Sequence, residues 1–445
     1  MAKKPVVLVI GGGYGGFNVV NGLRHTDVDI LLVDRHNHQL FQPLLYQVAT
    51  FELEPAAIAT PLRHLLKKQK NVHIGLAEIK GIDLKRQVAI GPRIEMPYDY
   101  LVVATGVQTS YFGHDEYKYL APGLKSLEDA QEIRRRILIA YEEAEWEADE
   151  ASRRAKLTFV IVGGGPTGVE LAGAIADAAH RTFPHDFKRI DTTNTRIVLI
   201  DGGDRLAKAM PAAASAQIER DLTKMGVEIR LHTRVTHVDK RGIMVGEERI
   251  EANNVFWAAG VQGVPLAHTL GVELDRAGRV MVGSDMAIPD FPNAFVVGDA
   301  AAATDAKTGD PVPGMAQGAI QTGKFVAEII REDMNGSSLA ERPAFSYFDK
   351  GSMATIGRGK AVTAVGDRHF GGFFGFVAWN ALHLAFLHGF RRKIVVLLAW
   401  IWNYLSNDRA ARIIIGDPDM EITEVSRGHQ LKSDKSIATD VENPK

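Results

Sequence analysis

Glycines recur in two places in a spacing that suits the binding of a pyrophosphate group. The two sets are Gly11, Gly13, Gly15 and Gly16, and then Gly163, Gly165 and Gly168. Each set contains the pattern G-x-G-x-x-G, which lets the backbone turn tightly and touch a phosphate. The helix expected after each turn offers free N–H groups and a partial positive charge at its N-terminus. The sequence therefore predicts two nucleotide-binding sites.

An aspartate follows each glycine set at the end of the next expected strand. Asp34 follows Gly16 by 18 residues, and Asp201 follows the second set after a polar insertion at 180–195. A carboxylate in this place accepts hydrogen bonds from ribose hydroxyls and repels a 2′-phosphate. Glycines rather than an arginine come directly after Asp201, so NADH is favoured over NADPH, while Arg205 nearby keeps NADPH open as an alternative.

Apolar runs and helical patterns around the glycines indicate a duplicated β-strand, α-helix, β-strand unit. Strands are expected at 6–10, 30–33, 100–103, 157–162, 196–200, 255–259 and 294–297, and helices at 17–23, 126–156 and 169–179. Continuous apolar runs of this length are typical of buried parallel strands. Ser126 should cap the long charged helix, with Asp129 three residues on. Two nucleotides on such units favour FAD with a nicotinamide dinucleotide, because hydride can pass between their rings.

Composition excludes several classes of protein. The chain has 445 residues, a net charge of −2 and no cysteine. That length predicts two or three domains. The charge is balanced, whereas a domain that binds nucleic acid is expected to be basic. Without cysteine there are no disulfides, thiolate metal sites or redox dithiols. We predict no metal site and no nucleic-acid partner.

Further motifs resemble the flavoproteins with two dinucleotide-binding domains, and most closely the type II NADH dehydrogenases, which are non-pumping NADH:quinone oxidoreductases. The superfamily resemblance rests on 104–106 (ATG), 257–261 (WAAGV) and 293–299 (NAFVVGD). The closer resemblance rests on 42–49 (QPLLYQVA), 163–173 (GGGPTGVELAG), 314–321 (GMAQGAIQ) and 347–357 (YFDKGSMATIG). The resemblance implies that the first glycine set binds FAD and the second binds NADH.

The resemblance also assigns residues to each nucleotide. For FAD they are Gly11, Gly13, Gly15, Gly16, Asp34, Arg35, Gln42, Thr105, Gly106, Asp299, Ala316 and Gln317; for NADH they are Gly163, Gly165, Thr167, Gly168, Glu170, Asp201, Ala259 and Gly260. Asp299 is implied to hold the ribityl chain of FAD. Lys350 belongs to a family motif, and either a contact with the flavin or a surface ion pair would suit it.

Three residues are candidates for catalysis. Gln317 and Gln321 lie four residues apart, so both amides share one face of a helix expected to begin near Pro313. Amides both donate and accept, which suits quinone oxygens, and the resemblance implies a quinone site here. A solvated helix face is the alternative. Glu170, expected in the first helical turn after the second glycine set, would deliver protons; an acid that merely suits a helix N-terminus is the alternative.

From Phe370 onward the chain is dense in aromatic and aliphatic residues, with Arg391, Arg392 and Lys393 between apolar runs at 370–390 and 394–405. We expect two helices that lie in one membrane leaflet as a monotopic anchor. A buried core or dimer interface and a spanning hairpin are the alternatives. His383 and His388 in this region are expected to serve packing. The alternative for His383 is that it replaces a lysine that some family members place near the quinone.

We therefore predict an α/β protein with two Rossmann-like domains and a C-terminal membrane-associating helical region. The expected boundaries are 1–118 and 276–345 for FAD, 119–275 for NADH, and 346–445 for the anchor and a polar tail. The predicted enzyme passes hydride from NADH to FAD and two electrons with two protons to a membrane quinone, without proton pumping. We expect a homodimer, peripheral on the cytoplasmic side of the inner membrane. A reductase with a soluble acceptor, ferredoxin or oxygen, and a nucleotide-sensing interaction protein are the alternatives.

Overall fold

The computed structural model describes residues 4–366 and 368–415. Its first body is built on a six-stranded sheet in the order β20-β21-β9-β1-β2-β5. The strands are β1 (Val6–Ile10), β2 (Asp29–Asp34), β5 (Val72–Leu76), β9 (Tyr100–Val103), β20 (Ala287–Ile288) and β21 (Phe291–Val296). All neighbours pair in parallel except β20 with β21. Strands from residues 6–103 and from residues 287–296 therefore form one sheet.

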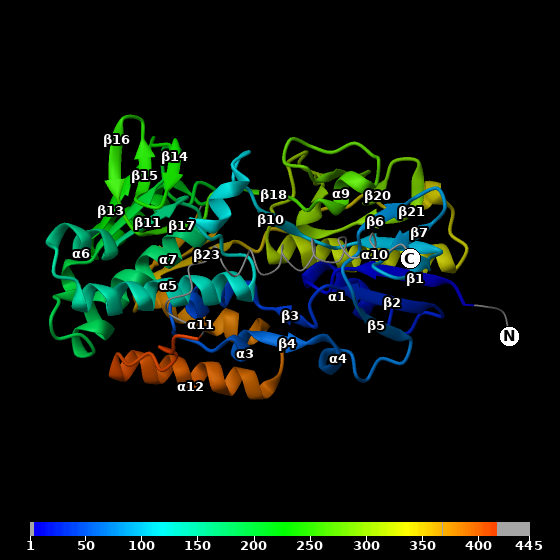
Figure 1. Ribbon diagram of the computed structural model, residues 1–445. Coiled ribbons are helices and arrows are strands. Elements are labelled where there is room, and N and C mark those ends of the chain that lie inside the picture. The colour runs from blue at the N-terminus through cyan, green and yellow to red at the C-terminus, as the bar shows by residue number, and fades with distance from the viewer. Residues whose placement is uncertain (1–3, 367, 416–445) are drawn as a thin grey trace, which may run out of the picture.

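Two helices pack on each other beside this sheet. They are α1 (Tyr14–Gly22) and α10 (Ala316–Met334). A Cβ on Gly323 would overlap the backbone oxygen of Gly15, so glycine lets the two helices approach closely. Figure 1 shows α10 running beside α1 at the centre of this body.

The second body repeats the design with a four-stranded parallel sheet in the order β13-β12-β11-β17. Its elements are β11 (Thr158–Val162), α7 (Pro166–Asp177), β12 (Arg196–Ile200), α8 (Ala212–Lys224), β13 (Val227–Arg230) and β17 (Asn254–Trp257). The insertion at 180–195 contains short helical turns: a π-helical one over Ala178–Thr182, then 3₁₀ turns over Phe183–His185 and Thr192–Asn194.

The single helix expected over 126–156 is wrong, because the structure divides it into α5 (Leu127–Trp146) and α6 (Glu150–Lys156). Ser126 and Asp129 form the expected cap, in which each side chain binds the backbone N–H of the other residue. The break comes where Asp149 caps a new helix by accepting from the Ser152 N–H at 2.7 Å.

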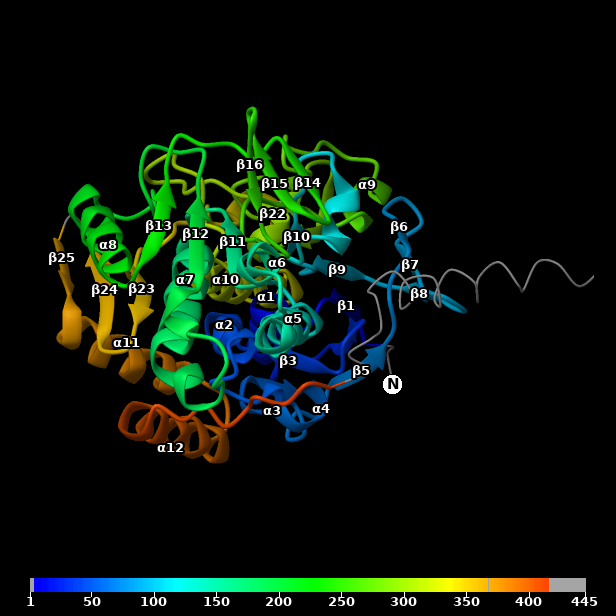
Figure 2. The ribbon, with the colours of Figure 1, turned by 60° about the vertical axis from the view of Figure 1, so that its left-hand side comes forward.

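The C-terminal part is a three-stranded antiparallel sheet followed by two helices. The strands are β23 (Ser352–Gly357), β24 (Lys360–Val365) and β25 (Arg368–Gly371), and the helices are α11 (Gly372–Phe386) and α12 (Phe390–Ser406). The helix expected from Phe370 starts later, because Phe370 belongs to β25. Figures 1 and 2 both place α12 along an outer edge of the molecule. Among the described residues, no helix combines the length and apolar character needed to cross a membrane.

Short elements fill the connections. They are β3 (His38–Leu40) with β4 (Ala59–Pro61); β6 (Gly81–Asp83), β7 (Val88–Ile90) and β8 (Glu95–Pro97); β10 (Val107–Thr109) with β18 (Val261–Gly263); β14 (His237–Asp239), β15 (Gly242–Val245) and β16 (Glu248–Glu251); β19 (Val280–Met281) with β22 (Ala301–Ala302); and α2 (Leu45–Ala49), α3 (Pro55–Ile58), α4 (Leu62–Leu65) and α9 (Leu266–Thr269). Short 3₁₀ turns cover Gln42–Leu44, Asp115–Tyr119, Gly298–Ala300 and Leu339–Glu341. The polar tail expected at the C-terminus lies outside the described residues.

Candidate functional site

The first glycine set forms a tight turn between β1 and α1. Gly11 has φ +105°, a backbone conformation that favours glycine, and a Cβ there would overlap the Ala104 carbonyl. A Cβ on Gly16 would overlap the Gly11 carbonyl oxygen. Gly13 is the N-cap of α1, and a Cβ on it would meet no atom within 4 Å. The turn thus presents a bare helix N-terminus to open space.

That space is a large cleft, which encloses about 2620 Å³ with its open mouth included. Ten of the twelve residues expected to bind FAD line it: Gly11, Gly13, Gly15, Asp34, Arg35, Gln42, Thr105, Gly106, Asp299 and Ala316. Gly16 lies beneath the turn, and Gln317 lies outside the cleft lining. The cleft lining is polar and apolar in about equal measure, and the hydroxyl of Tyr14 on its wall is buried with no hydrogen-bond partner within residues 4–366 and 368–415. These residues fit a flavin dinucleotide, whose polar atoms can satisfy such a group.

The two aspartates hold the turns together through hydrogen bonds from the backbone. Asp34 accepts from the N–H of Gly12 at 2.5 Å and of His36 at 2.7 Å. Asp201 accepts from the N–H of Gly164 at 2.6 Å and of Gly203 at 2.6 Å. Each carboxylate oxygen has a second lone pair that stays available to a ribose hydroxyl.

A lysine that the sequence motifs do not single out lies in the same cleft. Lys125 is largely buried, which lowers the pKa of its amine, while the charge of Asp299 opposes that shift. Burial conversely raises the pKa of Asp299, and Lys125 and Arg279 oppose it. Lys125 precedes the cap of α5, a signal for a helix start but not for a binding residue. The positive charge of Lys125 therefore acts on the carboxylate implied to hold the ribityl chain.

The second glycine set has the same geometry. Gly163 has φ +112°, and a Cβ there would come within 2.6 Å of the Ala259 nitrogen. A Cβ on Gly168 would overlap the Gly163 carbonyl oxygen, while one on Gly165, the N-cap of α7, would meet open space. Thr167 is the second residue of α7. The turn, the start of α7 and Ala259 are thus brought together as expected for a second nucleotide.

A two-stranded ribbon joins the edges of the two bodies. β10 continues from the Thr105-Gly106 turn and β18 from the Ala259-Gly260 turn, and they pair antiparallel with Gln108 opposite Gln262. Gly260 has φ +74°, and a Cβ there would come within 2.5 Å of the Phe112 ring. Figure 1 shows this ribbon between the two bodies. Loops that follow parallel strands of each sheet therefore meet, which suits two nucleotides whose rings must approach.

The two expected glutamines both lie in α10 but have different hydrogen-bond partners. Helix α10 begins at Ala316, two residues later than Pro313-Gly314 suggests. The Gln321 amide is engaged twice by Phe348, donating to its carbonyl at 3.0 Å and accepting from its N–H at 2.9 Å. The Gln317 side-chain oxygen is buried with no hydrogen-bond partner among the described residues. Gln317 is therefore the amide left to accept a hydrogen bond, and Gln321 fixes the chain beside it.

Glu170 lies in the second turn of α7 rather than the first, because the helix begins at Pro166. Burial raises the pKa of its carboxyl to about 8, and a hydrogen bond from the Thr355 backbone opposes that rise. Glu170 lines a second cavity of about 670 Å³, open mouth included, with residues of α2, β23 and α12. A buried acid with this pKa can hold and release a proton near neutral pH.

The two histidines of the C-terminal part pack against aromatic rings, whereas Lys350 lies at the surface. His383 stacks on Trp379 with ring centroids 4.0 Å apart, and burial lowers the pKa of its imidazole. His388 packs edge-on against Phe17 at 5.2 Å. Lys350 is exposed at the surface. None of these three lines either cavity.

Comparison with known proteins identifies the family. Residues 5–323 match the model of the pyridine nucleotide-disulphide oxidoreductases. The chain is 46% identical over 420 residues to the type II NADH:quinone oxidoreductase Ndh of Mycobacterium tuberculosis, which covers 92% of this chain and 89% of that protein. Identity to NdhA of the same organism is 44% over 423 residues, with the same shares covered.

Solved structures share the fold. NDH2 of Plasmodium falciparum, solved in complex with NADH, superposes with a TM-score of 0.84 at 18% identity, over 93% of this chain and 100% of that one. The sulfide:quinone oxidoreductase of Aquifex aeolicus gives 0.70 at 18% identity, over 95% of both chains. The duplicated cradles, the cleft for a flavin dinucleotide and the close relatives lead to one assignment: the chain belongs to the type II NADH:quinone oxidoreductases, within the pyridine nucleotide-disulphide oxidoreductase family.

Proposed function

We propose that this chain oxidises NADH and reduces a membrane quinone, using FAD as its resident cofactor. The proposal rests on the two glycine turns, here called cradles, which are brought together by the β10–β18 ribbon. One cradle opens onto the large cleft, and the other lies at the N-terminus of α7. When bound, FAD accepts hydride from NADH and passes two electrons to the quinone.

The chain's own residues bind and orient the reactants. The N-termini of α1 and α7 donate backbone N–H groups to the two pyrophosphates, and Asp34 and Asp201 accept from the riboses. Gln317 donates to a quinone oxygen through its amide nitrogen and accepts from a quinol hydroxyl through its oxygen. Glu170 holds a proton for quinone reduction. The Asp201 carboxylate favours NADH over NADPH.

The test combines a spectrum with an acceptor assay on the purified full chain. A flavin absorbance that NADH bleaches without oxygen is expected, followed by NADH oxidation with a short-chain quinone. Oxidation with oxygen or a soluble protein acceptor but not with quinone would favour a soluble-acceptor reductase. A bound flavin that NADH does not reduce would favour a sensing role, and a colourless chain that cannot be reconstituted with FAD contradicts the proposal.

The outer face of α11 and α12 supports binding to a lipid surface. Large apolar side chains project outward from both helices, among them Phe374 (80% exposed), Phe390 (79%) and Leu405 (73%). Arg391 is exposed at the start of α12, where it can meet anionic headgroups. Both helices are anchored from beneath, because Trp379 and Val396 are buried. We propose that this face attaches the protein to the cytoplasmic side of the inner membrane as a monotopic anchor.

Sedimentation with vesicles tests the attachment. The chain should bind vesicles with anionic headgroups, and the double change Leu398→Glu with Trp402→Glu on α12 should release it. Both side chains are 59% exposed, so their replacement leaves the core intact. Leu339→Glu, at a 56% exposed apolar residue elsewhere, is the matched control and should still bind. Unchanged binding of the α12 variant contradicts the proposal.

Two further assignments belong to this proposal. We assign residues 1–118 and 276–345 to the FAD-binding part, and the sheet that they share supports this. We assign residues 119–275 to NADH binding and residues 346–445 to the anchor. We also propose a homodimer. The molar mass in detergent, measured by light scattering, separates one copy from two.

A further inference from the structure

The large cleft in front of the first cradle contains one lysine that differs from the other basic residues around it. Four lysines and arginines of the described chain line this cleft: Arg35, Lys80, Lys118 and Lys125. The first three are exposed, whereas Lys125 is partly buried. Burial lowers the pKa of its amine, and the charge of Asp299 opposes that shift. Lys125 therefore carries its positive charge on the inner wall of the cleft.

The backbone of Lys125 is fixed on both sides. Its N–H donates to the Asp129 carboxylate at 2.9 Å, and its carbonyl accepts from the Gln42 amide at 3.5 Å. The next residue, Ser126, is the N-cap of α5. These contacts involve only the main chain of Lys125, so they position the lysine and would survive a replacement of its side chain.

The ammonium group of Lys125 has no hydrogen-bond partner within residues 4–366 and 368–415. Asp299 lines the same cleft, and each charge acts on the other without a hydrogen bond between the two groups. Arg279 also acts on Asp299, but its guanidinium is paired with Asp275 at 2.7 Å. A free ammonium and a free carboxylate thus face one cleft, and both groups are available to a ligand.

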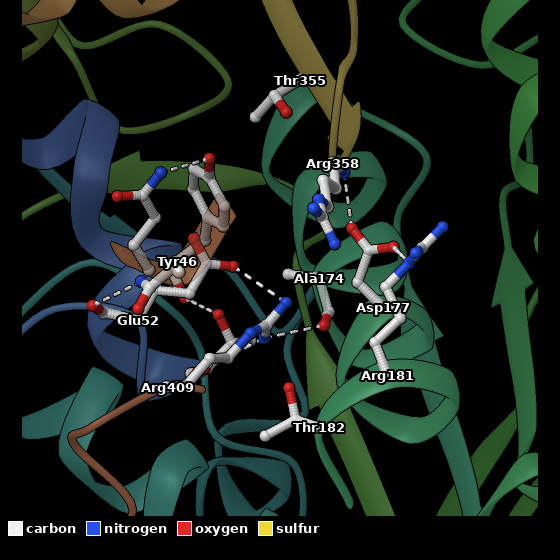
Figure 3. A network of polar contacts seen from close by, with 12 residues as sticks. Tyr46, Glu52, Ala174, Asp177, Arg181, Thr182, Thr355, Arg358 and Arg409 are labelled. Atoms are coloured by element: carbon white, nitrogen blue, oxygen red, sulfur yellow. Dashed lines mark hydrogen bonds and ion pairs between the residues drawn. The ribbon is translucent and has the colours of Figure 1, made fainter. Parts of the chain in front are cut away.

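Other cations in the interior of the chain have protein partners. Arg409, beside the second cavity, pairs with Glu52 at 3.1 Å and donates to the Ala174 carbonyl at 3.0 Å, as Figure 3 shows. Arg342 pairs with two aspartates, at 2.9 Å and 2.6 Å. A charge that is removed from water without a partner is costly. The contrast with these arginines indicates that the partner of Lys125 is a ligand.

FAD offers groups that match both charges. The pyrophosphate carries the negative charge of the oxidised cofactor, and the ribityl hydroxyls can donate to a carboxylate. We propose that the Lys125 ammonium binds the FAD pyrophosphate, in addition to the N–H groups at the start of α1. Lys125 belongs to the segment 119–275 and Asp299 to the FAD-binding part, so FAD then connects the two bodies. The inference rests on FAD as the resident cofactor.

The rate at which the FAD-bound full chain releases its cofactor tests this contact. Release is followed after dilution by the rise in flavin fluorescence. Lys125→Met should release FAD at least about tenfold faster, because it removes a charge-assisted contact. Lys125→Arg keeps the charge and should stay within about threefold of the wild type. Wild-type release in Lys125→Met overturns the proposal.

Lys118→Met is the matched control, because Lys118 lines the same cleft but is exposed. It should release FAD at the wild-type rate, and an acceleration equal to that of Lys125→Met contradicts a specific contact. If Lys125→Met does not fold, Lys125→Gln decides through the effect of salt. Salt screens an ammonium–phosphate pair, so 1 M salt should accelerate release less in Lys125→Gln than in the wild type. Equal acceleration overturns the proposal.

A double variant separates binding of phosphate from neutralisation of Asp299. If Lys125 only offset the charge of Asp299, Lys125→Met would have no effect in an Asp299→Asn background. A lysine that binds the pyrophosphate should still accelerate release there when it is removed. An unchanged release rate in that background overturns the proposal.

The reduction potential of the bound flavin shows which part of FAD the lysine meets. A contact with the pyrophosphate should leave the potential of Lys125→Met at the wild-type value. A lysine beside the flavin ring, whose reduced form is anionic, would lower the potential when removed, and that result with wild-type release overturns the proposal. A wild-type chain without flavin would contradict the proposed function, whereas bound flavin with unchanged release contradicts only the role of Lys125.

Discussion

The two glycine cradles share a backbone design but differ in one side chain. Gly11 donates to Val33 at 2.8 Å, and Gly163 donates to Ile200 at 2.7 Å. Seven residues after these glycines, the first cradle has Asn18 and the second has Glu170. Asn18 only donates back to the Tyr14 carbonyl within its own helix, at 2.8 Å. The duplicated scaffold therefore presents the same turn twice, and under our proposal a single different residue adds proton chemistry to one copy.

The two cradle helices also have different covers. Helix α1 is covered by α10, whose N-terminal Ala316 lines the deep cleft. Helix α7 is covered by β23, and a Cβ on Gly173 would overlap the Ile356 carbonyl. A deep, covered cleft suits a cofactor that stays bound, while the second cradle suits a substrate that must come and go. We therefore propose that the element covering each helix, more than the glycine turn, distinguishes the site of the resident nucleotide from that of the substrate.

The strongest test of this comparison places the same clash in each cradle. A Cβ on Gly16 or Gly168 would overlap the carbonyl of its partner glycine. Overpacking of this kind costs about 1–3 kcal/mol, or roughly 5- to 150-fold in affinity. Gly16→Ala should lose flavin absorbance after desalting, whereas Gly168→Ala should keep the flavin and raise the KM for NADH. The same phenotype in both variants would contradict the division of roles.

Replacing Glu170 tests the acid that only the second cradle has. Glu170→Gln should slow quinone-dependent turnover by about 10²-fold, the low end for a general acid. In the wild type, quinone turnover should fall as pH rises through about 8, where the carboxyl loses its proton. The variant should lack this fall. Asn18→Asp supplies the comparison, since an acid in the first cradle should not restore turnover in a Glu170→Gln background.

The same carboxyl makes folding stability depend on pH. Burial raises the pKa of this carboxyl to about 8 in the folded state, above the 4.5 usual for a solvated glutamate, so between these values the folded state holds a proton that the unfolded state has released. Stability from this group is therefore full below pH about 4.5 and is lost as pH rises to about 8, by at most roughly 1.4 kcal/mol per pH unit. Thermal unfolding at several pH values should show a shallower decline in Glu170→Gln. Parallel curves would contradict the burial of this acid.

The glutamines at the start of α10 should separate in their effects. Gln317→Ala should raise the KM for quinone, because it removes the amide whose oxygen has no partner among the described residues. Gln321→Ala removes two hydrogen bonds to Phe348 and should lower the melting temperature, at a cost of about 1–3 kcal/mol. Comparing the rise in quinone KM with the fall in melting temperature for each variant distinguishes the roles of the two glutamines. A larger rise in quinone KM for Gln321→Ala would reverse the assignment.

The smallest effect is expected at Asp201. Asp201→Asn keeps an acceptor for one of the two backbone N–H groups but removes the charge that repels a 2′-phosphate. A charge near solvent is worth about 1 kcal/mol, so the preference for NADH over NADPH should weaken roughly fivefold. The ratio of kcat/KM values for the two nucleotides measures it. Asp34→Asn in the first cradle should leave this ratio unchanged.

Local signals made the cradles and the main strands predictable. Glycine turns, the Ser126 cap and apolar strands each depend on a few adjacent residues, and their elements appear within a few residues of the expected bounds. The continuous charged pattern over 126–156 hides the break of the helix, because Asp149 is the N-cap of α6 within that pattern. The cavity beside Glu170 could not be predicted, because Arg409 reaches Thr50 across 359 residues of sequence. Which amide of the glutamine pair is engaged likewise depends on a distant backbone contact.

The absence of a side chain at Gly173 has a practical consequence for anyone seeking a detergent-free form of this enzyme. Because the backbone of β23 packs directly on α7 there, the C-terminal part that we propose to bind lipid is structurally continuous with the second nucleotide-binding body. Deleting the last two helices would strip Trp379 and Val396 from the interior and remove Arg409 with them. A soluble form is better obtained by substituting charged residues for the exposed apolar residues of α12 than by truncation.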